Sequence, residues 1–387
     1  MSANLEVHGT CDPRFRAVQD VFVRNFSTLG ETGAALAVVL DGQPVIDVWA
    51  GWSDAARTQP WQRDTIVNVY STTKGMTALC AHRLVDQGRL DLDAPVAKYW
   101  PEFAQGGKDT LPVHYLLSHR AGMAAVREPL PPMALYEWDT MANTLAAQTP
   151  WWEPGTKHGY HALTYGWLVG EVIRRISGKS VGAFFRDEVA QPLGVDFHIG
   201  LAAEHDARVA PLIPPPPPTP DQLDLLTEIL KDPESVLAKS FINPPIVPEA
   251  ANSREWRGAE IPAANGHTNA RALARVYGAL ARGGELDGVR ILSPESIARA
   301  RTEQAVGPDA LLPMYTRFGL GFMLSTPNDK MGPNAHAFGH GGMGGSLGFA
   351  DPDARIGFGY VMNEMHSGLW LIDPRPAALV AALYAAL

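Results

Sequence analysis

Apolar and polar stretches alternate along the chain in a way that predicts its first strands. Residues 34–40 are apolar, the pair Asp41-Gly42 interrupts them, and residues 44–49 are again mostly apolar. An Asp-Gly pair between two apolar runs is a strong signal for a tight β-hairpin. We therefore predict a hairpin over residues 34–52.

Helical spacing of apolar residues predicts three helices. In the clearest of them, over 165–177, the apolar side chains are Leu168, Val169, Val172, Ile173 and Ile176, which lie on one face. A short apolar lead-in at 66–70 comes before a predicted helix over 71–87, and a third helix is predicted over 269–282. Glycine, the usual residue beyond a helix C-terminus, follows each of them, at Gly88, Gly178 and Gly283-Gly284.

Strands are predicted at both ends of the chain and helices between them. Residues 347–362 hold two apolar runs around a polar turn, which predicts a second hairpin, whereas 91–192 favours helices and loops. The pattern indicates an α/β fold class (α+β) with two lobes. Residues 1–90 and 255–387 would form a discontinuous sheet lobe, and 91–254 a mainly helical lobe inserted into it.

A proline-rich loop is expected at 211–220, within the helical lobe. Pro214 to Pro218 are five consecutive prolines, a composition that favours an extended polyproline II spacer or surface arm. Such a run also suits docking of a partner domain, so both interpretations stay open.

Composition narrows the classes of function. The chain has 387 residues, of which 46% are hydrophobic, and its mean hydropathy is −0.08. These values are typical of a globular protein with a large core. Lys and Arg number 32 against 41 Asp and Glu, so the net charge is −9. Binding to nucleic acid or to anionic lipid needs clustered basic residues, and we therefore expect neither.

The N-terminal segment and the cysteines favour a cytoplasmic location. Residues 1–8 have neither the basic start nor the apolar run of a secretory signal. No stretch approaches the roughly 18 apolar residues of a membrane span. The two cysteines are Cys11 and Cys80, and Cys80 falls within an apolar helical pattern, where a buried free thiol is expected rather than a disulfide.

One tetrapeptide suggests nucleophilic chemistry. Residues 71–74 read Ser-Thr-Thr-Lys, the one S-x-x-K match in the chain. Side chains three residues apart on a helix share a face, so Lys74 can approach the Ser71 hydroxyl. A serine becomes a useful nucleophile when a base removes its proton, and a lysine can do so when burial lowers its pKa. The alternative is a serine helix cap followed by a solvated lysine.

Further segments, in a fixed order, resemble one superfamily. Residues 69–76 (Val-Tyr-Ser-Thr-Thr-Lys-Gly-Met), 87–96 and 116–123 (Leu-Leu-Ser-His-Arg-Ala-Gly-Met) resemble class C β-lactamase-like and penicillin-binding proteins. Residues 154–167 and 339–352 resemble the branch of family VIII carboxylesterases. The resemblance implies a β-lactamase/transpeptidase-like fold, with an antiparallel sheet flanked by helices, and a serine hydrolase.

The resemblance also assigns a tyrosine to the site. The family's Tyr-x-Asn motif is matched by Tyr160, His161 and Ala162. Tyr160 would be the general base, alone or with Lys74, and Tyr165 is the second choice. Since Ala162 replaces the asparagine that helps to hold a lactam's amide, lactam recognition is not expected to be strong.

A third motif is implied near the C-terminus. The Lys-Thr-Gly of the lactamases is matched by His340, Gly341 and Gly342. A mostly neutral imidazole offers less fixed charge than an ammonium, which favours neutral esters over anionic lactams. By the same resemblance, the backbone N–H groups of Ser71 and Met343 would form the oxyanion hole.

The sequence therefore predicts a serine carboxylesterase that hydrolyses small, short-chain esters through an acyl-enzyme on Ser71. No cofactor or metal is expected, the expected partner is a small-molecule ester and neither nucleic acid nor a membrane, and no oligomeric state is assigned. The alternatives are a β-lactamase, a D-alanyl-D-alanine peptidase-like enzyme or an acyltransferase, which would use the same residues. A sensor that is acylated once is a further alternative, but it would need no base for turnover, so the presence of Ser71, Lys74 and Tyr160 together argues against it.

Two other catalytic interpretations compete with Ser71. Residues 344–348 match the G-x-S-x-G motif of α/β-hydrolases, which would make Ser346 the nucleophile. That motif needs a helix directly after the serine, whereas a strand is predicted here. A metallohydrolase could use the histidine pairs His336/His340 or His158/His161, but no third ligand is evident.

Four aromatic residues have no single interpretation. Tyr136, Trp138, Trp151 and Trp152 fall in the predicted helical lobe. They suit the wall of an apolar acyl pocket as well as the core.

Overall fold

The computed structural model describes residues 5–217, 224–246 and 249–387. The predictions made above for Pro218 and for residues 1–4 concern positions outside the described residues. Residues 214–217 are exposed and belong to no helix or strand.

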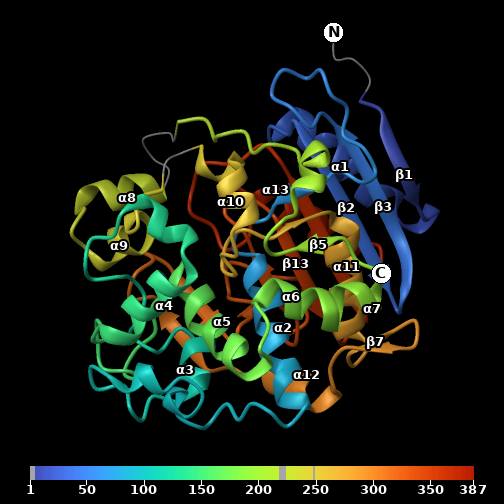
Figure 1. Cartoon of the computed structure of the whole chain (residues 1–387). Coiled ribbons are helices and arrows are strands. Elements are labelled where there is room, and N and C mark those ends of the chain that lie inside the picture. Colours follow the sequence, from blue (N-terminus) through green and yellow to red (C-terminus); the bar gives the residue numbers. More distant parts are fainter. Residues whose placement is uncertain (1–4, 218–223, 247–248) are drawn as a thin grey trace.

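A large antiparallel sheet joins the two ends of the chain. In the described residues its order is β1-β3-β2-β14-β13-β12-β11-β10-β9, and Figure 1 shows the blue N-terminal strands beside the red C-terminal ones. Its strands are β1 (Val7–Cys11), β2 (Gly33–Leu40), β3 (Gln43–Gly51), β9 (Ala305–Pro308), β10 (Tyr315–Phe318), β11 (Met323–Leu324), β12 (Phe338–Gly341), β13 (Leu347–Asp351) and β14 (Ile356–Met362). Smaller sheets are formed by β4 (Val67–Asn68), β5 (Phe197–His198) and β6 (His267–Thr268), and by β7 (Glu285–Leu286) and β8 (Val289–Arg290).

Both predicted hairpins are confirmed. Strands β2 and β3 pair with Leu40 opposite Gln43. The two residues between them, Asp41 and Gly42, have φ values of 47° and 84°, the left-handed conformation that a two-residue hairpin turn requires. Strands β13 and β14 form the second hairpin.

The helices lie mainly between the two sheet-forming ends. They are α1 (Arg16–Thr28), α2 (Thr73–Asp86), α3 (Val113–Leu117), α4 (Trp138–Ala147), α5 (Thr164–Ser177), α6 (Val181–Phe185), α7 (Gln191–Leu193), α8 (Leu225–Lys231), α9 (Val236–Ile242), α10 (Arg254–Gly258), α11 (Ala270–Ala281), α12 (Pro294–Ala300) and α13 (Pro374–Ala385). Short helical turns are η1 (Pro13–Phe15), η2 (Val96–Lys98), η3 (Pro101–Ala104), η4 (Pro132–Tyr136), η5 (Arg186–Ala190), η6 (Ala203–Arg208) and η7 (Ala250–Asn252). The helices predicted over 71–87, 165–177 and 269–282 correspond to α2, α5 and α11.

Helices cover both faces of the large sheet. Helix α11 packs on β2, β13 and β14, and it comes very close to β14. A Cβ at Gly357 would lie 2.1 Å from the Gly278 nitrogen, and one at Gly359 would lie 2.2 Å from the Ala270 oxygen. Alternate residues of a strand point to opposite faces, so Tyr360 points to the other face, where its hydroxyl bonds Glu31, a residue that Arg375 of α13 also bonds.

The helix predicted to carry the nucleophile is central and buried. Helix α2 packs against α5 and α6 (Figure 1), and it also contacts β12. Its side chains are buried over most of its length, and these include Cys80, which is a free thiol as expected. The arrangement confirms an antiparallel sheet flanked by helices, with a mainly helical region between its two sequence halves. The boundaries given above for the two lobes stay predictions.

Candidate active site

A strained turn presents Ser71 immediately before α2. The helix was predicted to begin at Ser71, but it begins at Thr73, because the preceding bonds span only three residues, from Thr73 N to Tyr70 O and from Lys74 N to Ser71 O. Tyr70 has a φ of 40°, which is unusual for an aromatic residue. Such backbone strain costs on the order of 1–3 kcal/mol and clusters at functional sites.

Lys74 reaches the Ser71 hydroxyl from within the core. Its side chain has no exposed surface, and Nζ lies 3.1 Å from Ser71 Oγ. Nζ also donates to the carbonyl oxygens of Ala162, at 2.7 Å, and of Ala263, at 2.9 Å. Burial lowers the pKa of Lys74 well below its usual value. A neutral amine has two N–H bonds and one lone pair, so two carbonyl acceptors leave that lone pair for Ser71.

Tyr160 is the tyrosine that lies beside this pair. Its ring centroid is 4.8 Å from Lys74 Nζ. Burial raises the pKa of Tyr160, although a side-chain hydrogen bond with Ser71 partly opposes the rise. The phenol is therefore neutral in the resting protein, which makes it a proton donor before it can serve as a base.

Tyr165, the second choice, has a different position. Its side chain on α5 is fully buried, and its hydroxyl donates to the backbone oxygen of Lys74 at 3.5 Å. Burial also raises the pKa of Tyr165. The hydroxyl is thus engaged by the backbone of α2, and the described contacts link Tyr160 rather than Tyr165 to the Ser71 side chain.

His340 lies on β12 next to Tyr160 and is neutral. The two ring centroids are 6.2 Å apart. Nδ1 is 2.6 Å from the Gly341 oxygen, so it carries the proton and leaves Nε2 as an acceptor. Among the described residues, this buried Nε2 has no hydrogen-bond partner. Burial and the nearby Lys74 lower the pKa of His340 to about 3.

The glycines after His340 let the third motif, residues 340–342, lie against the turn around Ser71. A Cβ at Gly342 would lie only 2.2 Å from the Val69 oxygen. The Thr72 hydroxyl also donates to the His340 oxygen, at 3.3 Å. Within the described part of the chain, the backbone N–H groups of Ser71 and Met343 appear in none of the hydrogen bonds. Both are available for an oxyanion, as the resemblance implies.

Ser346 joins the segment after His340 to the turn around Ser71, and it is not positioned as a nucleophile. Its side chain is buried, and its hydroxyl donates to the Val69 oxygen at 2.9 Å and lies 3.0 Å from the Thr72 hydroxyl. Strand β13 follows it at once, where a nucleophile elbow needs a helix. A Ser346 nucleophile would need an Asp and then a His downstream, and the acids and the histidine that follow it have other contacts: Asp351 binds Asn334 and Tyr384, Asp353 binds His336, and His366 binds Asp373.

The histidine pairs considered as metal ligands are held apart by other bonds. His161 uses Nδ1 on the Gly159 oxygen and Nε2 on the Met123 N–H, while His158 bonds the Thr316 hydroxyl. In the second pair, His336 is exposed and His340 is buried. Across residues 5–217, 224–246 and 249–387, no cluster of three or more His, Cys, Asp or Glu is suited to a metal.

Two residues that support Tyr160 were not predicted. The Asp309 carboxylate accepts the backbone N–H of Tyr160, at 3.1 Å, and the N–H groups of Leu311 and Leu312. His119, which has a φ of 60°, accepts the His161 N–H and packs against the Tyr160 ring at 4.9 Å. His119 stands in the segment 116–123 used for the resemblance, whereas no local pattern marks Asp309.

Of the four unassigned aromatic residues, one lies beside the Tyr160 segment. A Cβ at Gly159 would lie 2.9 Å from the Trp152 ring. The ring nitrogens of Trp138 and Trp151 instead bond Glu171 and the Ala125 oxygen. All four aromatic side chains are partly buried.

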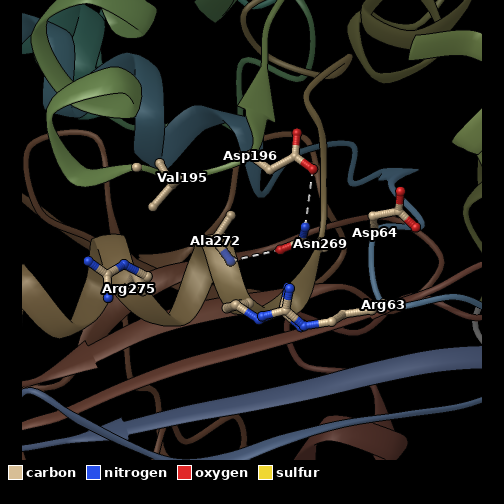
Figure 2. Close-up of a pocket in the computed structure, with 9 residues that line it drawn as sticks. Arg63, Asp64, Val195, Asp196, Asn269, Ala272 and Arg275 are labelled. Atoms are coloured by element: carbon tan, nitrogen blue, oxygen red, sulfur yellow. Dashed lines mark hydrogen bonds between the residues drawn. The ribbon is translucent and has the colours of Figure 1, made fainter. Parts of the chain in front are cut away.

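A separate cavity of about 280 Å³ lies beside the start of α11 (Figure 2). Figure 2 shows Asn269 bonded to Asp196 and to the Ala272 N–H. Two of its arginines are paired with carboxylates, Arg271 with Asp47 and Arg275 with Asp287. Its lining holds no serine or cysteine and none of the residues around Ser71.

Comparison with known proteins identifies the class. Residues 22–382 match the family described as Beta-lactamase, and the chain belongs to this family. The family resemblance and the fold class inferred from the sequence are thereby confirmed. The protein is an enzyme, a serine hydrolase of the esterase/β-lactamase type.

Individual relatives are similar over nearly the whole chain. The protein described as esterase/β-lactamase LipL of Mycobacterium tuberculosis is 41% identical over 375 residues, which cover 96% of this chain and 86% of that protein. A crystal structure of a family VIII carboxylesterase superposes with a TM-score of 0.91 at 43% identity, over 99% of this chain and 100% of that one. A penicillin-binding protein homologue from Caulobacter crescentus gives 0.90 at 42% identity, with the same coverage.

No helix in the described residues is long and apolar enough to cross a membrane.

Proposed function

We propose that this enzyme is a carboxylesterase that hydrolyses small, neutral, short-chain esters through an acyl-enzyme on Ser71. One observation carries the proposal: Lys74 Nζ lies 3.1 Å from Ser71 Oγ while two carbonyl oxygens accept its N–H bonds. With its pKa lowered by burial, the amine is available as a base. The names of the carboxylesterase and LipL relatives support an ester substrate.

In acylation, Ser71 Oγ attacks the ester carbonyl carbon and its proton passes to Lys74. The oxyanion is stabilised by the backbone N–H groups of Ser71 and Met343. When the C–O bond breaks, the neutral Tyr160 protonates the departing alkoxide and is reprotonated from Lys74. Water then attacks the acyl carbon while Lys74 and Tyr160 take up one of its protons. As the bond between that carbon and Ser71 Oγ breaks, they return the proton to Oγ, and the free acid is released.

The surroundings of Ser71 favour neutral substrates. His340 is neutral, since its pKa is lowered to about 3, and its free Nε2 lone pair would repel a carboxylate. Ala162 offers a methyl group where the lactamase motif has an amide. A β-lactamase remains the second candidate, because the printed name of the LipL relative includes that activity.

The test compares p-nitrophenyl butyrate with a chromogenic cephalosporin in wild type, Ser71→Ala and Ser346→Ala. We expect fast ester hydrolysis by the wild type, slow cephalosporin turnover and loss of ester hydrolysis in Ser71→Ala. Ser346→Ala, which removes the hydrogen bonds to the Val69 oxygen and the Thr72 hydroxyl behind the turn, should retain most activity. Full activity in Ser71→Ala would refute the assignment of the nucleophile, and faster cephalosporin turnover would favour the lactamase.

A further inference from the structure

The turn that carries the Met343 N–H is made almost entirely of glycine. Gly342 N donates to the Ser346 oxygen at 2.8 Å, and Gly345 N donates to the Gly342 oxygen at 3.0 Å. Gly344 and Gly345 have φ values of 85° and 130°. A glycine-rich turn has many accessible conformations, so a fixed direction for the Met343 N–H needs contacts from outside the turn.

Arg375, at the start of α13, makes such a contact from behind. Its side chain has no exposed surface, and Nη2 donates to the Gly344 oxygen. The backbone N–H of His366 donates to the same oxygen at 3.2 Å. The fit is close, because a Cβ at Gly345 would lie 2.4 Å from Arg375 Nη2.

All five N–H bonds of the Arg375 guanidinium have acceptors. Nε and Nη2 bond the two carboxylate oxygens of Asp373, at 3.0 and 3.1 Å. Nη1 bonds Glu31 at 3.2 Å and the Glu364 oxygen at 2.8 Å. The fifth bond is the one to the Gly344 oxygen. A planar guanidinium with every donor engaged has one orientation, so the position of that fifth bond is fixed.

The charges of this cluster are balanced within the core. Burial alone would raise the pKa of Asp373, but a hydrogen bond from His366 and the charge of Arg375 lower it overall. Burial raises the pKa of Glu31 to about 8, although Arg375 opposes the rise. The Arg375–Asp373 ion pair lies at the centre of the cluster, and Glu31 beside it has a raised pKa.

Stability alone is a weak reason for such a cluster. Replacing a buried ion pair by well-packed apolar residues is often neutral or stabilising. This ion pair is placed where one of its donors holds the peptide that follows Met343. The position of the Arg375–Asp373 ion pair is thus explained better by its hydrogen bond to the glycine turn than by a contribution to stability.

We propose that Arg375 is a positioning residue for the oxyanion hole: through the Gly344 carbonyl it fixes the glycine turn and with it the direction of the Met343 N–H. This inference rests on the proposed function, because it assumes that the Met343 N–H stabilises an oxyanion formed at Ser71. It predicts that weakening the Arg375–Gly344 bond slows chemistry at Ser71 and leaves substrate binding nearly unchanged.

The test uses Arg375→Lys, which keeps the charge but has three donors in place of five and lacks the planar fork that fixes the direction of the bond to the Gly344 oxygen. The matched control is Glu31→Gln, which alters the same cluster and leaves the bond to Gly344 in place. If Arg375→Lys does not fold, Asp373→Asn serves instead, since it removes the carboxylate that orients the guanidinium. The readouts are kcat and KM for p-nitrophenyl butyrate, the melting temperature, and the rate at which a p-nitrophenyl phosphonate labels Ser71.

We expect kcat of Arg375→Lys to fall roughly 10- to 100-fold, as for a displaced oxyanion donor. The labelling rate should fall by a similar factor, because phosphonylation also develops charge on an oxygen. KM should change by less than about threefold, and Glu31→Gln should keep both rates near wild type. A folded Arg375→Lys with a lower melting temperature but wild-type kcat and labelling rate would overturn the inference.

The labelling rate separates this inference from the proposed function. If the wild type is labelled at Ser71 but hydrolyses no ester, the proposed function fails. The labelling rates of the variants then still decide whether Arg375 positions the oxyanion hole. An equal loss in Arg375→Lys and Glu31→Gln would also overturn it, because the effect would then belong to the whole cluster and not to the bond with Gly344.

Discussion

Replacing Lys74 by arginine separates two roles that this residue could have. Arginine keeps a positive charge and can donate to the oxygens of Ala162 and Ala263, but it stays protonated and has no lone pair for Ser71. If Lys74 acts as a base, Lys74→Arg should be as inactive as Lys74→Met. If it supplies only charge, Lys74→Arg should retain activity.

The size of the effect follows from the hydrogen bonds of Nζ. Two of its three partners are carbonyl oxygens and the third is Ser71 Oγ, so the substitution removes the base and leaves the donors. General base catalysis contributes roughly 10²- to 10⁴-fold, which corresponds to about 3 to 5 kcal/mol of transition-state stabilisation. We therefore expect Lys74→Arg to lose about 10³-fold in the acylation rate, measured as the burst of p-nitrophenol in stopped flow.

Lys108 provides a matched control for this substitution. It is also a buried lysine, and its Nζ donates to three carbonyl oxygens, those of Gln105, Ala146 and Gln148, with no serine among its partners. Lys108→Arg should lower the melting temperature as much as Lys74→Arg and leave acylation near wild type. Acylation by a folded Lys74→Arg within tenfold of wild type would refute the base role.

Three further outcomes are expected. Tyr160→Phe should lower kcat about 100-fold by removing the proton donor, whereas Tyr165→Phe, whose hydroxyl bonds only the backbone of α2, should stay within a few fold of wild type in the same ester assay. His340→Lys introduces a cation next to Tyr160 and near Lys74, so the ratio of cephalosporin to ester turnover should rise. An unchanged ratio would show that His340 does not select against anions. Glu31 has a pKa of about 8 in the folded protein against an ordinary 4.5, so the folded state binds more protons between these values and stability falls as pH rises across that window. Glu31→Gln removes this loss of stability with pH. The free energy of unfolding of the variant relative to wild type, measured in urea at pH 5 and at pH 8, should therefore be larger at pH 8. An equal difference at the two pH values would contradict the raised pKa of Glu31.

Much of the fold was predictable because its signals are local. The Asp41-Gly42 pair fixes the turn of the first hairpin, and Gly178, with a φ of 74°, ends α5 where the pattern stops. The predicted start of α2 was less accurate, because the turn around Tyr70 is set by segments far away in the sequence. Its Val69 N–H, for example, bonds the Gly266 oxygen.

The site was predictable only where a motif marks it. Ser71 and Lys74 are three residues apart, so helix geometry alone brings them together. Tyr160 and His340 came from resemblance, since nothing local indicates that they lie next to Lys74. Asp309 and Arg375 were missed because each acts on a backbone group far away in the chain, and such tertiary hydrogen bonds leave no periodic pattern.

The most direct test of the central claim is to locate the acyl group on the protein. Wild type is mixed with excess p-nitrophenyl ester, quenched in acid within the burst, digested and mapped by mass spectrometry. The account predicts one acylated peptide with the acyl group on Ser71, and no adduct in Ser71→Ala. An acyl group on Ser346, or ester turnover by a protein that never carries an acyl group, would contradict it.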